Sequence, residues 1–279
     1  MPRKLFCEIS PLTYKISREK CIFIRRLRNA VSGVRFAATR SDAPLPCLVY
    51  EHKSLIRRKL GNVDSRLQDN KAVNLSIAAP TVSGILVQPG ETFSFWKLVG
   101  RTSSRRGYLD GLNISRGQVT SGVGGGMCQF TNLIHWMVLH SELTVTEHHH
   151  HERLDLFPDS NRLVPFGTGT AIVYNYIDYR FRNDTNRVYQ LIIYSDGEYL
   201  RGELRASLPE RFNFLVYEDD AYFYEQAGTF YRHNKIYRRT VDSSTGEAVG
   251  TELILENNAK VCYDSKFIDK EKIKWTLKN

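Results

Sequence analysis

A run of three glycines placed directly before a helical pattern is the feature that most restricts how this chain can fold. The stretch "SGVGGGMCQFTNLIHWMVLH" carries Gly124, Gly125 and Gly126, followed by Met127 and Cys128. Beyond them, apolar residues recur at the spacing of one helical face, namely Phe130, Leu133, Ile134, Met137 and Val138, with Ser141 on the same face. The spacing predicts a helix from about Cys128 to Ser141 whose N-terminus is formed by the glycines.

The rest of the chain combines further helical patterns with β structure. We expect helices over 15–38, 48–68 and 71–81, a strand at 85–87, an aromatic strand at 93–96 and a strand at 143–147. Beyond Gly167, alternating segments are separated by turn residues at 183–184, 196–197 and 244–246. The pattern predicts an α+β fold in which the cysteine-bearing helix packs on an antiparallel sheet, followed by a β-rich C-terminal part and preceded by a basic helical arm.

Length and composition are those of a globular chain with one main domain. The 279 residues are 42% hydrophobic and 25% charged, so the chain can bury a sizeable core. The Pro-containing stretch "SDAPLPC" at 41–47 is typical of a linker. We therefore expect a basic amphipathic arm at 1–45, a main domain at 46–205 and a β-hairpin appendage at 206–279.

Positive charge is concentrated at the N-terminus. Residues 1–40 hold ten Lys/Arg and two acidic residues, which is a net +8 out of the +9 of the whole chain. The remaining residues are almost neutral, which argues against a nucleic-acid groove across the fold. The basic pattern at 15–38 has two interpretations: the helix lies on an anionic membrane surface, or it is a surface helix that packs on the domain by its apolar face.

Cysteine usage favours a reducing compartment. The five cysteines, an odd number, fit no zinc-binding spacing. The apolar stretch "CIFI" is too short for a secretory signal, and no run approaches the roughly 18 apolar residues of a membrane span. We therefore expect a cytoplasmic protein, peripheral at the inner face of the membrane if 15–38 binds lipid.

Cys128 has the surroundings of a nucleophile. The free N–H groups at a helix N-terminus stabilise a thiolate, and the N–H groups near Gly126–Cys128 can hold a developing oxyanion. Gln129 can orient or donate beside it. Two other interpretations stay open, because a cysteine can be a core residue and a glycine run before a helix can cradle phosphate. The phosphate interpretation lacks the Lys and Ser/Thr of a P-loop.

Four histidines, His148 to His151, follow the strand at 143–147. Alternate residues of an extended chain share a face, so His149 and His151 point one way and the other two the opposite way. Either His149 or His151 is a candidate base for Cys128, oriented by Glu147 or Glu152. A pair on one face is also a candidate metal ligand set with Cys128, although no further Cys/His cluster completes it. His135 and His140 are expected to be packing or surface residues.

Three motifs in this order resemble the VanW family. The core stretch "GGGMCQ", the helix and the histidines resemble the family pattern Gly-Gly-Gly-x-Cys-Gln, helix, Glu-Arg-His-x-His. "QPGETFSFWKLVG" at 88–100 and "YIDYRFRNDT" at 176–185 resemble the family's upstream and downstream motifs. Two positions depart from the pattern. His148 stands where the family has Arg, and Gly169 stands where the family has Asp.

The resemblance implies a role in glycopeptide resistance and cell-wall metabolism. Some relatives are implicated in L,D-transpeptidation of peptidoglycan with the motif cysteine as nucleophile. Transferred to this chain, that role gives catalytic Cys128, His149 and His151, with Gly124, Gly125, Gly126 and Gln129 as substrate-binding or oxyanion residues. If the family's Asp orients the base, this chain lacks that group at Gly169.

Three hypotheses therefore remain. The first is a cysteine acyltransferase or peptidase acting on peptidoglycan or its precursors. The second is a non-catalytic protein that binds a cell-wall peptide, a precursor or a partner protein. The third is a His/Cys metal-binding protein. No motif predicts a cofactor.

Overall fold

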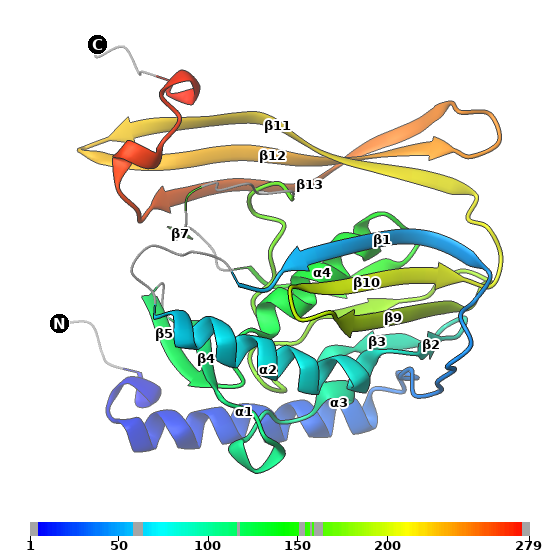
Figure 1. Cartoon of the computed structure of the whole chain (residues 1–279), viewed down its shortest axis with the longest axis horizontal. Coiled ribbons are helices and arrows are strands. Elements are labelled where there is room, and N and C mark those ends of the chain that lie inside the picture. Colours follow the sequence, from blue (N-terminus) through cyan, green and yellow to red (C-terminus); the bar gives the residue numbers. More distant parts are fainter. Residues whose placement is uncertain are drawn as a thin grey trace.

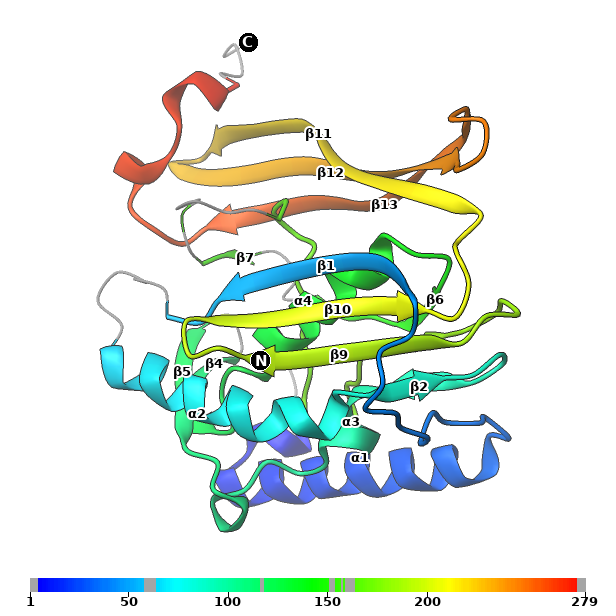
Figure 2. The same cartoon turned by 45° about the vertical axis from the view of Figure 1, so that its right-hand side comes forward.

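The structure is built in layers, with a long helix on one side and a long-stranded sheet on the other (Figure 1). It is a computed structural model that describes residues 5–57, 64–115, 118–150, 154–156, 158 and 164–274. The helix α1 (Pro11–Val31) lies at the bottom of Figure 1, and the strands β11 (Phe212–Gln226), β12 (Thr229–Asp242) and β13 (Ala248–Val261) lie at the top. Between these layers are the remaining sheets, with α2 (Ser65–Val82) and α4 (Met127–Leu139) packed against them (Figure 2).

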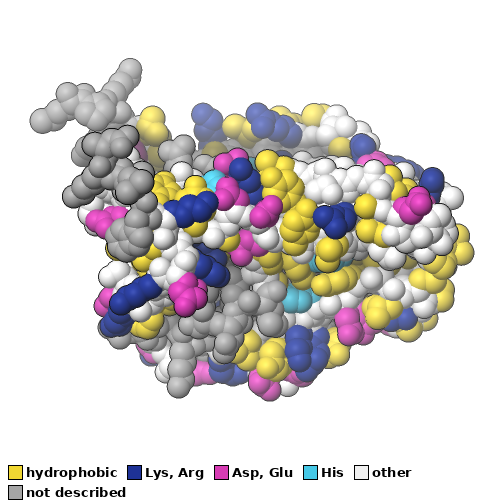
Figure 3. Space-filling model, turned by 90° about the horizontal axis from the view of Figure 1, so that it is seen from above, with side chains coloured by type: hydrophobic (Ala, Val, Ile, Leu, Met, Phe, Trp, Pro, Cys, Tyr) yellow, Lys and Arg dark blue, Asp and Glu magenta, His cyan; other side chains and the backbone are white. Residues whose placement is uncertain are grey.

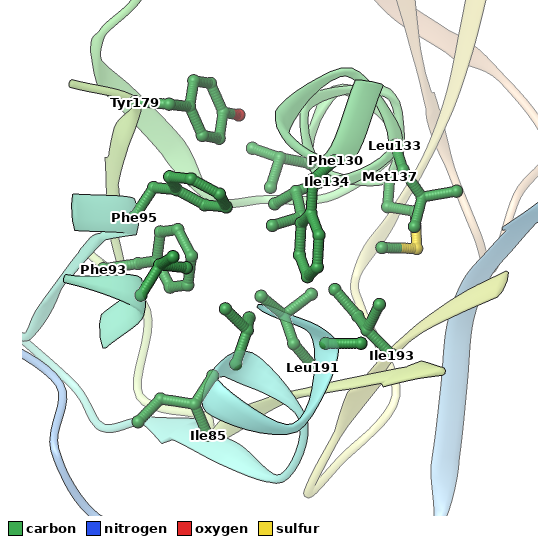
Figure 4. Packing of buried hydrophobic residues seen from close by; sticks show 14 of the residues in the cluster. Ile85, Phe93, Phe95, Phe130, Leu133, Ile134, Met137, Tyr179, Leu191 and Ile193 are labelled. Atoms are coloured by element: carbon green, nitrogen blue, oxygen red, sulfur yellow. The ribbon is translucent and has the colours of Figure 1, made fainter. Parts of the chain in front are cut away.

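The central sheet is antiparallel and has the order β1-β10-β9-β2. Its strands are β1 (Cys47–Leu55), β2 (Ile85–Val87), β9 (Tyr189–Ser195) and β10 (Tyr199–Ala206). The helix α2 packs over β9, and α4 packs over β10 and β1. Apolar side chains of α4 and β9 meet in the shared core (Figure 4), among them Phe130, Leu133, Ile134, Met137, Leu191 and Ile193. This burial fixes the position of the N-terminus of α4.

A second, small sheet lies beside this core. It has the order β3-β8-β6, built from β3 (Thr92–Ser94), β8 (Arg180–Arg182) and β6 (Thr144–Glu147). The short helix α3 (Phe95–Val99) follows β3 directly, so the predicted strand at 93–96 is wrong in its second half. Ser94 ends the strand because its hydroxyl accepts from the Lys97 N–H and caps the helix. The 3-10 turn η2 (Ser104–Arg106) then leads to the hairpin of β4 (Asp110–Ser115) and β5 (Gln118–Val123).

The C-terminal sheet packs on the other side of α4. Its order is β11-β12-β13-β7, and the two-residue strand β7 (Leu154–Asp155) pairs in parallel with β13. Trp136 and Leu139 of α4 share a cluster with Val216 and Ile236 of this sheet. Two 3-10 turns, η3 (Ser265–Phe267) and η4 (Lys270–Lys272), follow β13. The domain boundaries expected at 45 and 205 stay a prediction.

The predicted α+β class is confirmed, and several elements agree with the sequence. The strand at 85–87 and the turns at 196–197 and 244–246 lie where they were expected. The helix expected over 48–68 is wrong over 48–55, because residues 47–55 form β1 and pair with β10, with a bulge between Leu48 and Tyr50. Residues 65–68 are helical as expected, at the start of α2, and 58–63 lie outside the described residues. A local helical pattern is a weak signal when a partner strand can satisfy the backbone hydrogen bonds.

The N-terminal helix packs by its polar face. It begins at Pro11, capped by Ser10, and ends at Val31, earlier at both ends than the predicted 15–38. A short 3-10 turn, η1 (Phe6–Glu8), precedes it. The interpretation in which this helix packs by its apolar face is wrong, because only Ile22 of its apolar residues is buried. In the part of the chain that the structure describes, no helix is long and apolar enough to span a bilayer.

Candidate functional site

The glycine run is required by close backbone packing at the start of α4. A Cβ on Gly125 would lie 2.2 Å from the carbonyl carbon of Gly111 in β4, and a Cβ on Gly126 would lie 2.4 Å from Cγ of Lys71 in α2. Gly126 also has φ of 108°, a conformation that L side chains rarely adopt. The side-chain amide of Asn74 donates to the Gly125 carbonyl at 2.9 Å. The glycines therefore let the hairpin, α2 and α4 meet at one point.

Cys128 lies in the first turn of α4, and its thiol is not activated in this structure. Burial raises the pKa of the Cys128 thiol, while hydrogen bonds from the backbone N–H groups of Ile172 and of Cys128 itself act in the opposite direction. The pKa of the thiol is therefore raised, whereas a helix N-terminus alone would lower it. The residue as a whole is half-buried, although burial is the main cause of the raised pKa of its thiol. At neutral pH the group is a thiol.

A short segment, Thr170 to Ile172, covers this thiol. Asn132 of α4 accepts from the backbone N–H and the hydroxyl of Thr170 at 2.6 and 2.9 Å. The Thr170 hydroxyl also pairs with that of Thr131. The next residue, Ala171, donates its N–H to the His149 carbonyl at 2.6 Å. Two side chains of α4 thus hold the segment that touches both Cys128 and the backbone of His149.

Gln129 faces away from this segment. Its side-chain amide donates to the Ser54 hydroxyl at 2.8 Å and to the Leu55 carbonyl at 2.9 Å. Both acceptors belong to the end of β1. In this structure, Gln129 ties the N-terminus of α4 to the central sheet.

The histidines alternate as the extended chain predicts. The half-exposed ring of His149 pairs with Glu147 at 3.2 Å, on the side of α1. His148 and His150 point the opposite way, where the ring of His148 stacks on the buried His135 of α4 with 4.0 Å between centroids. His151 lies outside the described residues. Within those residues, no hydrogen bond joins the Cys128 thiol to a histidine side chain.

The two positions that depart from the VanW pattern touch each other. His148 donates from Nε2 to the carbonyl of Gly169 at 3.1 Å. Burial, and then the charge of neighbouring His150, lowers the pKa of His148 to about 4. Burial also lowers the pKa of His135 well below its usual range, and its Nε2 has no hydrogen-bond partner in the described structure. At the two positions that depart from the family pattern, this chain therefore has a neutral histidine bonded to a backbone carbonyl.

A buried polar network joins the three motifs in space. Asp178, which is fully buried, accepts from the Ser94 hydroxyl, the Trp96 N–H and the Arg180 guanidinium at 2.5, 3.0 and 2.8 Å. Its own N–H donates to Glu147 at 2.9 Å. The sequence named Glu147 as a residue that could orient a histidine, but it did not assign Ser94, Trp96, Asp178 or Arg180 to the site. The signal was present, because Ser94 and Asp178 lie in the upstream and downstream motifs and Glu147 precedes the histidines.

The described residues offer no obvious metal centre. No group of three or more His, Cys, Asp or Glu side chains in the described ranges is placed to hold an ion. His151 and Glu152 lie outside those ranges. The metal hypothesis therefore stays a prediction, tested by the metal content of the purified protein.

Comparison with known proteins assigns the chain to a family. Residues 70–205 match the family model described as VanW like protein. The chain is 32% identical over 265 residues to the vancomycin B-type resistance protein VanW of Enterococcus faecalis, which covers 94% of this chain and 95% of that protein. This chain belongs to the VanW family. The family model spans the glycine run, α4, the histidines and the network around Asp178, so these features are the VanW-like part of the molecule.

A second relative shares a smaller part. The chain is 30% identical over 118 residues to the uncharacterized protein YoaR of Bacillus subtilis, a match that covers 42% of this chain and 37% of that protein. No solved structure matches the chain significantly. Family membership therefore rests on sequence, and the arrangement of the VanW motifs described above comes from this structure.

Proposed function

We propose that this VanW-family protein is a non-catalytic accessory of glycopeptide resistance and cell-wall metabolism, which binds a cell-wall peptide or precursor, or a partner protein. The observation that carries this proposal is the state of Cys128. Its thiol is covered, hydrogen-bonded by the Ile172 N–H and has a raised pKa. A thiol in that state is a poor nucleophile, because only the thiolate attacks.

The neighbours of Cys128 also favour the binding proposal, because their side chains are bonded to other groups of the protein. The amide of Gln129 is already bonded to β1, and the ring of His149 pairs with Glu147. These groups hold the protein's own segments in place. In this proposal, the motif is a structural signature that presents a binding surface near Thr170–Ile172.

The cysteines support a reducing compartment for this function. All five are free thiols. Proteins that persist in oxidising compartments use disulfides far more often. We propose that the protein works in the cytoplasm, where cell-wall precursors are available at the inner face of the membrane.

Cysteine acyl transfer of the L,D-transpeptidase type is the second candidate. One observation favours it: Cys128 stands in the first turn of α4, two residues after the left-handed Gly126, and the N–H groups at a helix N-terminus can hold a developing oxyanion. The thiolate would attack a peptide carbonyl, and the amine would leave with a proton from His149 or His151. An acceptor amine would then take the acyl group and return the thiol. This requires the segment over the sulfur to move.

The two candidates are separated by replacing Cys128 in a host whose glycopeptide resistance depends on this protein. We expect Cys128→Ala to retain the resistance level and the melting temperature of the wild type. Cys262→Ala, which alters an exposed cysteine, is the matched control. Loss of resistance by a normally folded Cys128→Ala protein would overturn the binding proposal and favour acyl transfer.

Alkylation gives an independent readout that needs no substrate. The rate at Cys128, followed against pH by peptide mapping, should be far below that of exposed Cys21 and Cys262. The rate should not change in His149→Ala or His151→Ala. A fast rate near neutral pH that one of these substitutions abolishes would identify an activated nucleophile.

A further inference from the structure

The helix α1 presents its apolar side chains to solvent. Leu12, Ile16, Phe23, Leu27 and Val31 have exposed fractions between 50% and 74%. At 100° per residue these five positions fall within one side of the helix, so they form an apolar stripe, which the exposed Lys20 interrupts between Ile16 and Phe23. We call them the α1 stripe. Phe6 and Ile9, just before the helix, are also exposed. Isolated exposed apolar residues are ordinary, but a stripe along the full length of a helix marks an interaction site.

Polar contacts on the opposite side hold the helix in this orientation. Arg25 pairs with Glu147, and Asn29 accepts from the Arg180 guanidinium at 3.0 Å. Glu19, at the edge of the stripe, pairs with Arg101 of the main domain at 2.5 Å. Rotating the helix to bury its stripe would break these contacts with the network around Asp178. The outward direction of the stripe is therefore fixed by the fold.

We propose that α1 docks on the surface of an anionic lipid bilayer, with the α1 stripe at the boundary between the headgroups and the acyl chains. This goes beyond the proposed function, because it holds whether or not Cys128 has a chemical role. The charge of the segment selects the partner. Lys15, Lys20, Arg26 and Arg28 are exposed on the same helix. Residues 1–40 carry a net +8, and interfacial helices combine such basic side chains with an apolar face.

The distribution of charge over the rest of the molecule favours lipid over a second copy of the chain. On the face opposite α1, acidic and basic side chains are interspersed, as the view from the C-terminal sheet shows (Figure 3). Two copies meeting through their α1 stripes would bring two segments of +8 together, which is electrostatically unfavourable. An anionic bilayer attracts the same charge, by about 1 kcal/mol for each Lys or Arg near the surface.

A cation-lined hollow beside the stripe fits this orientation. A cavity of about 320 Å³ lies between α1 and α3 and is lined by Arg26, Trp96, Lys97, Tyr174 and Asn175, among others. Arg26 donates to the Tyr174 hydroxyl at 3.4 Å and Lys97 lies 4.4 Å from the centre of the Phe36 ring, but within the described residues neither cation is paired with a carboxylate. Asn175 is buried beside them. A lipid phosphate beside the helix would meet two cations that have no carboxylate partner in the described part of the chain. Docking should therefore depend on anionic headgroups.

The experiment is co-sedimentation of the full chain with vesicles. One set is phosphatidylcholine alone, and the other is phosphatidylcholine with an equal part of phosphatidylglycerol. We expect binding to the anionic vesicles that weakens with salt. Phe23→Ser with Leu27→Ser should lower the partition coefficient at least tenfold, since two apolar side chains lose their burial in lipid. Arg26→Gln with Lys97→Gln should lower it severalfold and reduce its salt dependence.

A control pair of substitutions tests whether any loss of exposed apolar side chains weakens binding to the vesicles. Leu215→Ser with Leu253→Ser changes two exposed leucines of the C-terminal sheet and should leave binding unchanged. Absence of wild-type binding to anionic vesicles, or equal binding by the Phe23/Leu27 variant, would overturn the proposal. A lipid-free dimer that the Phe23/Leu27 variant dissociates would assign the stripe to a second copy, and would overturn it as well. Because these readouts do not involve Cys128, they are independent of the resistance assay.

Discussion

The histidine cluster under the site should make the protein sensitive to mild acid. In the folded state, burial lowers the pKa of His148 to about 4, whereas in the unfolded chain its pKa is near 6.5. The unfolded chain therefore binds more protons between these two pH values. By linkage, the free energy of unfolding must fall as the pH drops through that window. The protein keeps its full stability with respect to His148 only above about pH 6.5, where the ring is neutral in both states.

The size of the effect follows from the two pKa values. A single group with these values loses about 2 kcal/mol of unfolding free energy between pH 7.5 and pH 5, and about 3 kcal/mol once the pH is below 4. Burial also lowers the pKa of His135, so its contribution has the same sign. A loss of 2 kcal/mol is a large share of the stability of an ordinary domain.

Urea denaturation at several pH values between 5 and 7.5 measures this slope. His148→Gln should flatten it by about 2 kcal/mol across that range, because the titrating ring is gone. Gly169→Asp should also flatten it while keeping the ring. A Cβ at Gly169 would have its nearest atoms at 3.7 and 3.8 Å, which is ordinary contact. We expect a carboxylate at this position to raise the pKa of His148 by stabilising its charged form.

Gly169→Asn is the matched control, since it has the same shape without the charge. It should keep the wild-type slope. The reasoning is refuted if His148→Gln retains the full wild-type slope, or if Gly169→Asn flattens the slope as much as Gly169→Asp. The first result would place the acid sensitivity elsewhere, and the second would make it a packing effect.

Two further predictions concern stability. Gly125→Ala should lower the free energy of unfolding by more than about 3 kcal/mol or prevent folding, because its Cβ would lie 2.2 Å from the Gly111 backbone. Gly169→Ala, measured in the same way by thermal or urea denaturation, should lower it by less than about 1 kcal/mol. A well-folded, stable Gly125→Ala protein would contradict the close packing. Glu147→Gln should cost about 3 kcal/mol, because it removes the half-buried carboxylate that pairs with Arg25 and that also lies 3.5 Å from Arg180, which keeps Asp178. Asp69→Asn, in an exposed pair with Arg57, should cost less than about 1 kcal/mol. Equal losses in the two variants would contradict the structural role of Glu147.

Much of the fold could be predicted because it depends on local patterns. The helix of Cys128 follows from apolar residues at helical spacing, and the predicted alternation of the histidines followed from the period of an extended chain. The short strand at 85–87 and the tight turns were readable for the same reason. Errors arose where a tertiary partner decided the outcome. Residues 47–55 are a strand because β10 pairs with them, and Phe95 and Trp96 are helical because Ser94 caps them and Asp178 accepts the Trp96 N–H.

The candidate site was likewise predicted in part by the sequence and decided in part by the tertiary structure. The sequence alone predicted Cys128 at the start of a helix, the glycines before it and the resemblance that family membership confirms. It could not reveal that the glycines serve backbone contacts with Gly111 and Lys71, or that Thr170–Ile172 covers the thiol, because these residues are far apart along the chain. It also could not decide which face of α1 points outward. Periodicity shows that a helix has two faces, but the direction of each face depends on partners such as Glu147 and Arg180, which only the folded chain brings to it.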